Sequence, residues 1–182
     1  MTLDIEKLFA LGIRVGDKLV ARNETLAVAE SSAGGLVSAA LLARAGASAY
    51  YFGGAVLYTR RSRRLLTALT ADDTTDMRSS SPPWAQLLAR HQRTRFKASW
   101  GLAETGAAGP TGNSYGDPAG HTCLAVDGPV LRDRMLRTGH GDRPANMLAF
   151  AMAALELLEK ALDAANKERP PVKGDEPAEQ AL

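Results

Sequence analysis

Apolar residues recur along the chain in two spacings, one typical of helices and one typical of buried strands. Near the N-terminus they lie three or four positions apart, which predicts a helix from Asp4 to about Asn23. The apolar run 26–28 and the aromatic, β-branched run 50–58 predict two strands, and small residues with leucines over 33–45 predict a helix between them. Strands that alternate with helices indicate an α/β fold.

The second half of the chain adds further elements and ends in a polar segment. Asp127-Gly128 is a hairpin turn signal between two apolar runs, so an antiparallel pair is expected beside a partly parallel sheet. Residues 166–182 lack periodicity and are predicted to be a disordered tail behind a domain of residues 1–165. The other expected elements are a helix from about Arg60, a polar loop at 70–81, a helix from Pro82 to about Arg95, strands at 98–104, 121–127 and 130–138, and a last helix from Pro144 to about Leu162.

Composition places the chain among ordinary soluble proteins. Its 182 residues suffice for one domain with its own core, and 45% of them are hydrophobic and 23% charged. No apolar run approaches the ~20 residues of a membrane span, and the N-terminus lacks the order of a signal peptide, so a cytoplasmic location is expected. A net charge of +2 does not by itself imply a nucleic-acid partner.

The single cysteine and the three histidines point away from metal or redox chemistry. Cys123 cannot form an internal disulfide and lies within an apolar run, which favours a buried structural thiol over a reactive one. His91, His121 and His140 lack the spacing of metal ligands, so neither a metal nor another cofactor is expected.

The segment 25–35 places Ser31 and Ser32 between a predicted strand and a predicted helix. The N–H groups that begin such a helix can bind an anion or stabilise an oxyanion, and Gly34 and Gly35 let a ligand approach the backbone. A serine hydroxyl at this turn is a candidate nucleophile. It is equally a candidate N-cap that only satisfies the first turn of the helix, and the segment alone leaves both interpretations open.

Four arginines in five residues, Arg60, Arg61, Arg63 and Arg64, form the densest basic cluster of the chain. On a helix, Arg60 and Arg64 share a face one turn apart. The cluster fits a solvated helix surface or a phosphate clamp, in which Arg63 with Arg60 or Arg64 holds a ligand phosphate. A nucleic-acid surface is a weaker interpretation, because neither interleaved aromatic residues nor a further basic stripe accompanies the arginines.

The glycine-rich loop 105–120 follows a predicted strand, as the serine turn does. Loops of this length in compact domains are usually functional or disordered, and the position after a strand favours function. In an open α/β sheet the segments that follow parallel strands gather in one crevice at the carboxyl edge. We therefore expect the segments 30–35, 58–64 and 105–120 to line one site.

Together these segments resemble the C-terminal domain of the CinA (competence/damage-inducible protein) family, which includes nicotinamide-nucleotide amidases. The resemblance covers about residues 5–162 and follows several motifs in the family's order. These motifs are Ala29-Glu30-Ser31 with Gly34-Gly35, Gly46 with Ser48-Ala49 before Gly53-Gly54, Tyr58-Thr59, Thr105-Gly106 with Ala108-Gly109-Pro110, Pro118 with Gly120, and Gly141-Asp142-Arg143.

The resemblance implies a three-layer α/β/α sandwich with a mixed, mostly parallel sheet, and a homo-oligomer, expected to be a dimer. It also implies metal-free hydrolysis of the carboxamide of nicotinamide mononucleotide to nicotinic acid mononucleotide and ammonia. Ser31 matches the family's nucleophile, and the family's base is a lysine shortly after the tyrosine that matches Tyr58. The predicted catalytic residues are Ser31, Tyr58, Arg63 and Glu30, and the predicted substrate-binding residues are Ser32, Gly34, Gly35, Arg60, Thr105, Gly106, Gly109, Asp142 and Arg143.

Several of these residues also have plainer interpretations, and the sequence departs from the family pattern at four positions. Asp142 and Arg143 fit a helix cap and a surface charge. Arg63 stands where the lysine is expected, and a guanidinium stays protonated at working pH and cannot act as a general base. Asp117 replaces a lysine in the glycine-rich loop and reverses a charge expected to face the ligand, and Ser32-Ala33 replaces a cysteine-threonine pair.

The departures leave two functions open. The chain is either an amidohydrolase whose Ser31 is activated by Glu30, Tyr58 or water, or a degenerate relative that binds a nucleotide without turning it over. A third class, an interaction protein without a small-molecule site, fits the arginines but leaves the serine turn unexplained.

Overall fold

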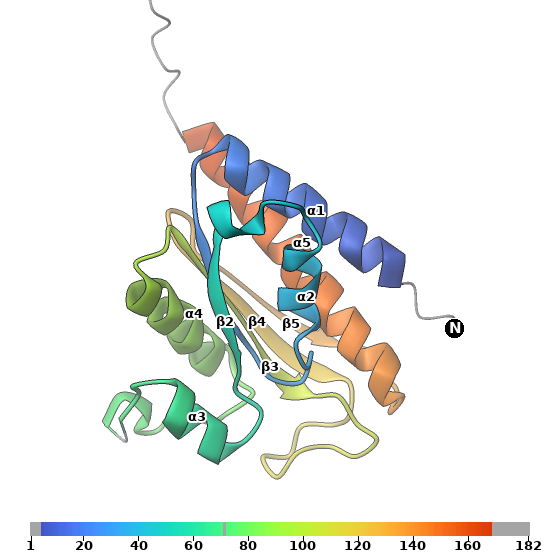
Figure 1. Ribbon diagram of the computed structural model, residues 1–182. Helices are drawn as coiled ribbons and strands as arrows, with labels where there is room; N and C mark the ends of the chain where they lie inside the picture. The colour runs from blue at the N-terminus through green and yellow to red at the C-terminus, as the bar shows by residue number, and fades with distance from the viewer. Residues whose placement is uncertain (1–4, 71, 169–182) are drawn as a thin grey trace, which may run out of the picture.

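The computed structural model describes residues 5–70 and 72–168, which form a five-stranded sheet with helices on both faces (Figure 1). The predicted N-cap Asp4 and residues 169–182 of the predicted tail lie outside the described residues. The elements are α1 (Ile5–Ala21), β1 (Leu26–Glu30), α2 (Leu36–Leu42), η1 (Ala47–Ala49), β2 (Tyr51–Val56), α3 (Arg60–Leu66), η2 (Asp72–Thr74), α4 (Pro82–Phe96), β3 (Trp100–Ala107), β4 (His121–Asp127), β5 (Arg132–Arg137) and α5 (Arg143–Glu168).

The sheet has the strand order β2-β1-β3-β4-β5. β1 pairs in parallel with β2 and with β3, whereas β3 pairs with β4 and β4 with β5 in antiparallel fashion. The α/β class and the mixed sheet are as predicted, but "mostly parallel" is too strong, because half of the pairings are antiparallel. The reason is local: a connection as short as the one after Asp127 joins antiparallel strands, since a parallel pair needs a crossover.

The helices form two layers around the sheet. α1, α2 and α5 lie on one face and α4 lies on the other, so the predicted three-layer arrangement is confirmed. Strand residues alternate between the faces: in β3, Leu102 belongs to the core under the three helices and Ala103 to the smaller core under α4. α4 lies so close to the sheet that a Cβ on Gly101 would overlap the carbonyl of Ala89.

The helix predicted at 33–45 is shorter in the structure. Gly34 and Gly35 have φ angles of 68° and 98°, left-handed values that are readily adopted only by glycine, and they lengthen the turn after β1. α2 therefore begins at Leu36 with Gly35 as its N-cap. The interpretation of Ser31 or Ser32 as that N-cap is wrong, and both serines lie within the turn.

Two other boundaries differ from expectation. β3 continues through Ala107, so the glycine-rich loop begins three residues later than predicted. α5 continues to Glu168, three residues into the segment predicted as a tail. No helix of the described ranges 5–70 and 72–168 is both long and apolar enough to cross a membrane.

The carboxyl ends of β1, β2 and β3 meet at one edge of the sheet, at the bottom of Figure 1. β5 also ends there, because two antiparallel steps return it to the direction of β3. The turn 31–35, the start of α3, the loop 108–120 and the start of α5 consequently gather at this edge.

The packing of α1 on α2 gives a first prediction. A Cβ on Gly12 of α1 would overlap the carbonyl of Ala40 in α2. Gly12→Ala should therefore lower the free energy of unfolding by about 1–3 kcal/mol, although alanine is the better helix former. Urea unfolding followed by circular dichroism measures this change.

The exposed residue Ala10 offers the matched control on the same helix. Ala10→Ser should change the free energy of unfolding by less than about 0.5 kcal/mol. If Gly12→Ala were as stable as the parent protein, the two helices would not pack at this distance.

Candidate functional site

A cavity of about 400 Å³ lies at the carboxyl edge of the parallel strands. Most of the residues predicted for the site come together in it. Four do not line it: Glu30, Gly34, Gly35 and Asp142. The nine that do are Ser31, Ser32, Tyr58, Arg60, Arg63, Thr105, Gly106, Gly109 and Arg143.

A buried carboxylate, that of Glu104 in β3, fixes the serine turn. Its Oε2 accepts hydrogen bonds from the N–H groups of Ser31 and Ala33, each at 2.9 Å, and its Oε1 accepts from the hydroxyls of Ser32 at 2.6 Å and Thr122 at 2.8 Å. Four donors compensate for burying a side chain that is only 1% exposed. Ser31, by contrast, lines the cavity, and its hydroxyl has no hydrogen-bond partner among the described residues.

The carboxylate of Glu30 is engaged at the start of α2. It accepts hydrogen bonds from the N–H groups of Gly35, Val37 and Ser38 at 2.9 to 3.1 Å, and from the Ser38 hydroxyl at 2.5 Å. Burial, against these hydrogen bonds, raises the pKa of Glu30. Because both carboxylate oxygens accept from the start of α2, this geometry gives no support to Glu30 as the group that activates Ser31.

These hydrogen bonds leave one backbone donor of the turn available. Within residues 31–35, four of the five N–H groups donate to Glu104, to Glu30 or to the carbonyl of Ser31. The fifth is the N–H of Ser32, for which the described residues supply no acceptor. The helix start predicted to bind an anion is therefore already occupied, and the remaining donor adjoins the candidate nucleophile.

The start of α5 joins two other segments of the cavity wall. Arg143 donates through Nη1 to the carbonyl of Gly109 at 2.6 Å and through Nη2 to the hydroxyl of Tyr58 at 2.7 Å. Its guanidinium also lies 5.7 Å from the centroid of the Tyr58 ring. Asp142 caps the helix, since its Oδ1 accepts from the N–H of Ala145 at 3.1 Å. The cap interpretation thus holds for Asp142, whereas Arg143 is more than a surface charge.

Arg63 and an unpredicted residue, Tyr115, line another part of the wall. Arg63 lies over the ring of Trp84, 5.3 Å from its centroid, and donates through Nη1 to the hydroxyl of Ser79 at 2.6 Å. The Ser79 hydroxyl, followed by the guanidinium groups of Arg60 and Arg63, stabilises the ionised form of Tyr115. These groups outweigh burial and lower the pKa of Tyr115 from 10.0 to about 8.

The glycine-rich loop is ordered around Asn113. The Asn113 side chain accepts from the N–H groups of Tyr115 and Asp117 and donates to the Asp117 carboxylate at 2.8 Å, which also accepts from Arg78 at 2.5 Å. Asp117 is 8% exposed and lies outside the cavity lining. The expectation that its negative charge faces the ligand is wrong, because Arg78 neutralises that charge inside the loop.

Cys123 fits the structural thiol predicted for it. It is fully buried in the smaller core, and burial above all raises its pKa to about 11. In the part of the chain that the structure describes, no group of three or more His, Cys, Asp or Glu side chains could hold a metal ion.

Glu104 and Tyr115 are among the residues at the site that the sequence analysis missed, as are Ser79 and Trp84. Glu104 follows four apolar residues of a predicted buried strand, and a carboxylate in such a place is a signal in itself, because it needs donors. Tyr115 is the only aromatic residue between 105 and 120. Neither signal says which groups each side chain meets.

The domain is thus a mixed α/β sheet with a serine turn and an arginine-lined cavity at the carboxyl edge of its parallel strands, which is where α/β domains commonly bind ligands. Residues 9–162 match the family model of the CinA C-terminal domain. The chain belongs to this family, as its motifs predicted.

Relatives and solved structures agree with this assignment. The chain is 36% identical over 145 residues to a CinA-like protein of Anaeromyxobacter sp. (strain Fw109-5), covering 80% of this chain and 35% of the relative. It is 33% identical over 172 residues to a CinA-like protein of Chlorobium phaeovibrioides, covering 88% of this chain and 40% of the relative. The chain thus spans little more than a third of the length of these curated relatives.

Two crystal structures superpose on most of the domain. A CinA superfamily protein from Klebsiella pneumoniae 700603 gives a TM-score of 0.79 at 28% identity, over 86% of this chain and 98% of that one. A competence/damage inducible protein from Agrobacterium tumefaciens gives 0.77 at 30% identity, over 86% and 95% of the two chains.

The bonds of Glu104 predict its contribution to stability. Glu104→Ala leaves two backbone N–H groups without an acceptor and opens a void, so the free energy of unfolding should fall by about 3 kcal/mol or more. Glu104→Gln should lower the free energy of unfolding by less. Its amide oxygen still accepts from the N–H groups of the turn, and the hydroxyls of Ser32 and Thr122 can rotate to accept from its NH₂ group. Urea unfolding of both variants measures the difference.

The exposed Glu156 provides the control, since its side chain is 45% exposed and only loosely paired with Arg134 at 3.4 Å. Glu156→Ala should change the free energy of unfolding by no more than about 1 kcal/mol. Equal losses for Glu104→Ala and Glu156→Ala would contradict the role given to Glu104.

The lowered pKa of Tyr115 predicts a tyrosine that ionises early. Absorbance at 295 nm should show one tyrosine titrating near pH 8, and Tyr115→Phe should abolish that step. Arg63→Ala removes a positive charge that favours the phenolate, so the midpoint should move up towards 10. Arg61→Ala, outside the cavity lining, should leave it unchanged; a midpoint indifferent to Arg63 would contradict the assignment.

Proposed function

We propose that the domain is an amidohydrolase that acts on the carboxamide of a nicotinamide nucleotide, with Ser31 as nucleophile. One observation carries the proposal: Ser31 and Ser32 are consecutive lining residues of the cavity, and the Ser31 hydroxyl and the Ser32 N–H both lack partners among the described residues. An acyl-transfer site needs both a nucleophile and a donor for the oxyanion.

The reaction proceeds in two steps at this turn. Ser31 Oγ attacks the carboxamide carbon and gives up its proton, and the carbonyl oxygen becomes an oxyanion that accepts a hydrogen bond from the Ser32 N–H. When this intermediate collapses, the C–N bond breaks and the nitrogen takes up a proton and leaves as ammonia. Water then adds to the acyl-serine, which releases the carboxylate and restores the Ser31 hydroxyl.

The proton acceptor is not the lysine expected from the resemblance. Arg63 stands at that position, remains protonated, and is held against Trp84. Glu30 is occupied at the start of α2. Of the candidates inferred from the sequence, Tyr58 and water remain, and the Tyr58 oxygen lies in the cavity wall beside Arg143.

Arg60 and Arg63 are suited to bind the phosphate of the substrate. Arg60 and Arg63 line the same cavity as Ser31, and neither forms an ion pair with a described residue. Guanidinium groups bind phosphate by bidentate hydrogen bonds, so these two residues are assigned to the substrate phosphate.

The alternative is a relative that binds a nucleotide without turning it over. It is favoured by the same Arg63, because loss of a general base alone lowers a rate on the order of 10²–10⁴-fold. The two functions share the binding site and differ only in turnover.

Dimerisation is part of the proposal and gains support from α1. Ile5, Phe9 and Ile13 recur one turn apart along this helix and are 36 to 39% exposed. An apolar stripe of this kind is typical of a surface that meets another copy or another protein.

Ammonia release from nicotinamide mononucleotide tests the proposed activity. The parent protein should turn the substrate over, and Ser31→Ala should lower the rate on the order of 10³-fold or more. Ser48→Ala, at an exposed position outside the cavity, is the matched control and should keep the parental rate. Tyr58→Phe separates the two remaining proton acceptors when it is compared with Arg143→Ala, which also breaks the contact between the two side chains: a tyrosine base makes Tyr58→Phe the slower of the two variants.

Arg63→Lys distinguishes the two functions. If Arg63→Lys released ammonia and the parent protein did not, the chain would be a degenerate relative that has lost its general base. If neither the parent protein nor any variant released ammonia, the amidase proposal would be overturned.

A further inference from the structure

A second cavity of about 650 Å³ adjoins the candidate active site. Five residues line both cavities: Arg60, Arg63, Ser79, Trp84 and Tyr115. The second cavity extends from this shared wall along α3 and the segment that follows it. Nothing in the proposed reaction on a mononucleotide uses this space.

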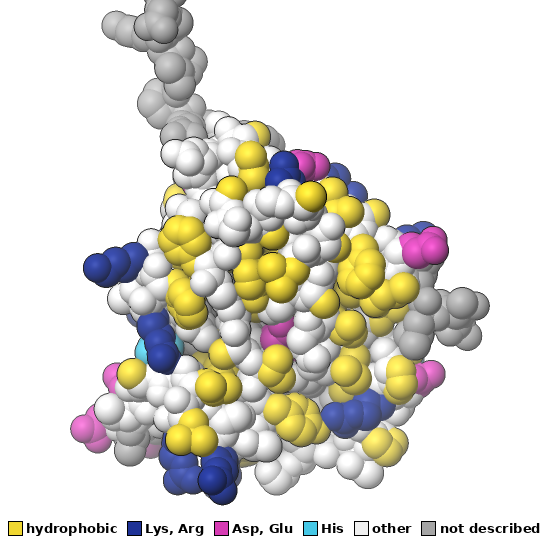
Figure 2. All heavy atoms as spheres, viewed as in Figure 1, with side chains coloured by type: hydrophobic (Ala, Val, Ile, Leu, Met, Phe, Trp, Pro, Cys, Tyr) yellow, Lys and Arg dark blue, Asp and Glu magenta, His cyan; other side chains and the backbone are white. Residues whose placement is uncertain are grey.

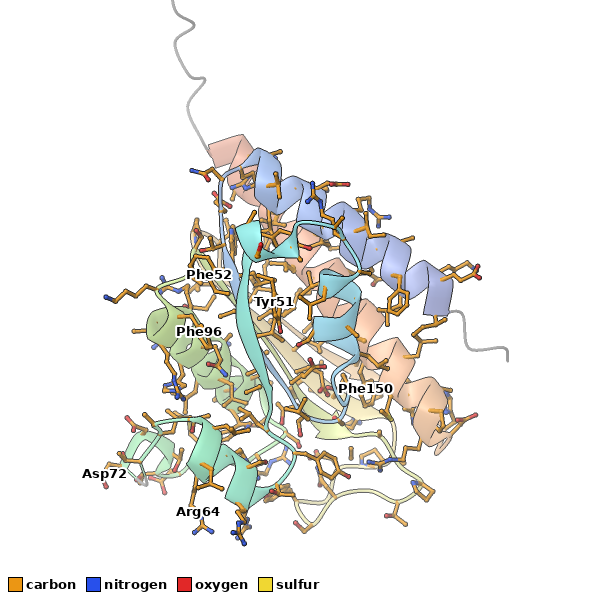
Figure 3. The ribbon with its side chains drawn as sticks, in the orientation of Figure 1. Tyr51, Phe52, Arg64, Asp72, Phe96 and Phe150 are labelled. Carbon is orange, nitrogen blue, oxygen red and sulfur yellow. The ribbon has the colours of Figure 1, made fainter. Side chains whose placement is uncertain are left out.

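The second cavity has the chemistry of a phosphate-binding site that also contains apolar side chains. Arg64 joins Arg60 and Arg63 in its lining, and the apolar side chains of Leu69 and Met77 lie there too. Its described lining residues include no aspartate or glutamate. Figure 2 shows Lys and Arg side chains gathered over α3, and Figure 3 shows the exposed Arg64 extending from that helix away from the sheet.

The described residues do not neutralise the charge of these arginines. Elsewhere arginines pair with carboxylates, as Arg14 does with Glu159 at 2.7 Å, whereas Arg60, Arg63 and Arg64 form no ion pair with a described residue. Such an excess of unpaired positive charge attracts anions.

Helix stability does not explain all of this charge. Arg63 and Arg64 lie in the last turn of α3, where cations are favourable, but Arg60 begins the helix, where they are not. Arg60 and Arg64 also repel each other at the i, i+4 spacing. An anion beside the cluster would relieve both effects.

The junction of the two cavities suits a ligand that continues through it. Arg63 is already held by Trp84 and Ser79, so it can contact a phosphate at small entropic cost. The first cavity lies near the lower end of the ~300–1,000 Å³ typical of ligand sites, and both cavities together reach its upper end.

We propose that the second cavity binds the distal phosphate and ring of a dinucleotide, so that the site accepts dinucleotides with a terminal pyridine carboxamide as well as mononucleotides. The carboxamide end lies at Ser31, the first phosphate at the shared arginines, and the second phosphate at Arg64. The aromatic ring of the distal half packs on the apolar lining residues Leu69 and Met77. This assignment rests on the proposed function for the orientation of the ligand.

Calorimetry with ligands that lack the carboxamide tests binding apart from turnover. ADP-ribose should bind more tightly than ribose 5-phosphate, because only ADP-ribose reaches the second cavity. Arg64→Ala should weaken the binding of ADP-ribose about tenfold more than the binding of ribose 5-phosphate, because the variant loses a charged hydrogen bond to ADP-ribose alone. Arg61→Ala, on the same helix but outside both linings, should alter neither affinity more than twofold.

Equal affinities for the two ligands, or equal effects of Arg64→Ala and Arg61→Ala, would overturn the assignment. Circular dichroism of Arg64→Ala checks that this variant is folded.

Ammonia release from NAD⁺ and from nicotinamide mononucleotide separates this inference from the proposed function. Turnover of both substrates, with Arg64→Ala lowering kcat/KM more for NAD⁺, supports the two together. Turnover of the mononucleotide alone, with no preference for ADP-ribose, leaves the amidase and overturns the dinucleotide assignment. If neither substrate released ammonia but ADP-ribose bound in an Arg64-dependent way, the proposed amidase activity would be overturned and the second cavity would be supported as a nucleotide-binding site.

Discussion

The buried carboxylate of Glu104 is the contact on which the candidate site depends. Its donors come from the turn after β1 and from β4, so one side chain in the middle strand ties together both of its neighbours. A buried charge is tolerated only where donors surround it, and the turn in return is held in one conformation. Glu104 accepts a hydrogen bond from the N–H of Ser31, and Glu30 accepts from the N–H groups at the start of α2. The hydroxyl of Ser31 and the N–H of Ser32 are left without a partner among the described residues.

Positive charge around the cavity has two distinct roles. Arg143 uses its donors on the loop at Gly109 and on Tyr58, and so joins α5 to the other walls. The arginines of α3 remain without carboxylate partners among the described residues, although Arg63 is immobilised against Trp84. The first set joins the walls of the cavity, and in our proposal the second set binds the phosphate of the ligand. The Ser79 hydroxyl, with Arg60 and Arg63 of this second set, lowers the pKa of Tyr115 to about 8.

The sequence-based predictions were accurate where a feature depends on neighbouring residues and inaccurate where it depends on residues far apart in the chain. β4 was predicted at 121–127 to the residue, because an apolar run bounded by a glycine and a turn signal is a local pattern. The start of α2 was predicted three residues early, because two glycines in left-handed conformations extend the turn without changing the small-residue pattern. Asp117 was expected to face the ligand because a position in a motif does not reveal its partner, and that partner is Arg78, 39 residues away.

By itself, the sequence determined the α/β class, the family, and the segments that meet at one edge of the sheet. Those depend on hydrophobic period, glycine positions and motif order, which are properties of neighbouring residues. Only the tertiary structure decided between the two acids: Glu30 and Glu104 both follow apolar strand residues, yet one caps α2 and the other holds the serine turn. The choice depends on hydrogen bonds across 71 to 73 residues, and the second cavity likewise arises only where α3, α4 and the glycine-rich loop come together. Such contacts follow from the packing of whole elements, because a side chain's partners are set by the fold around it and not by its neighbours in the chain.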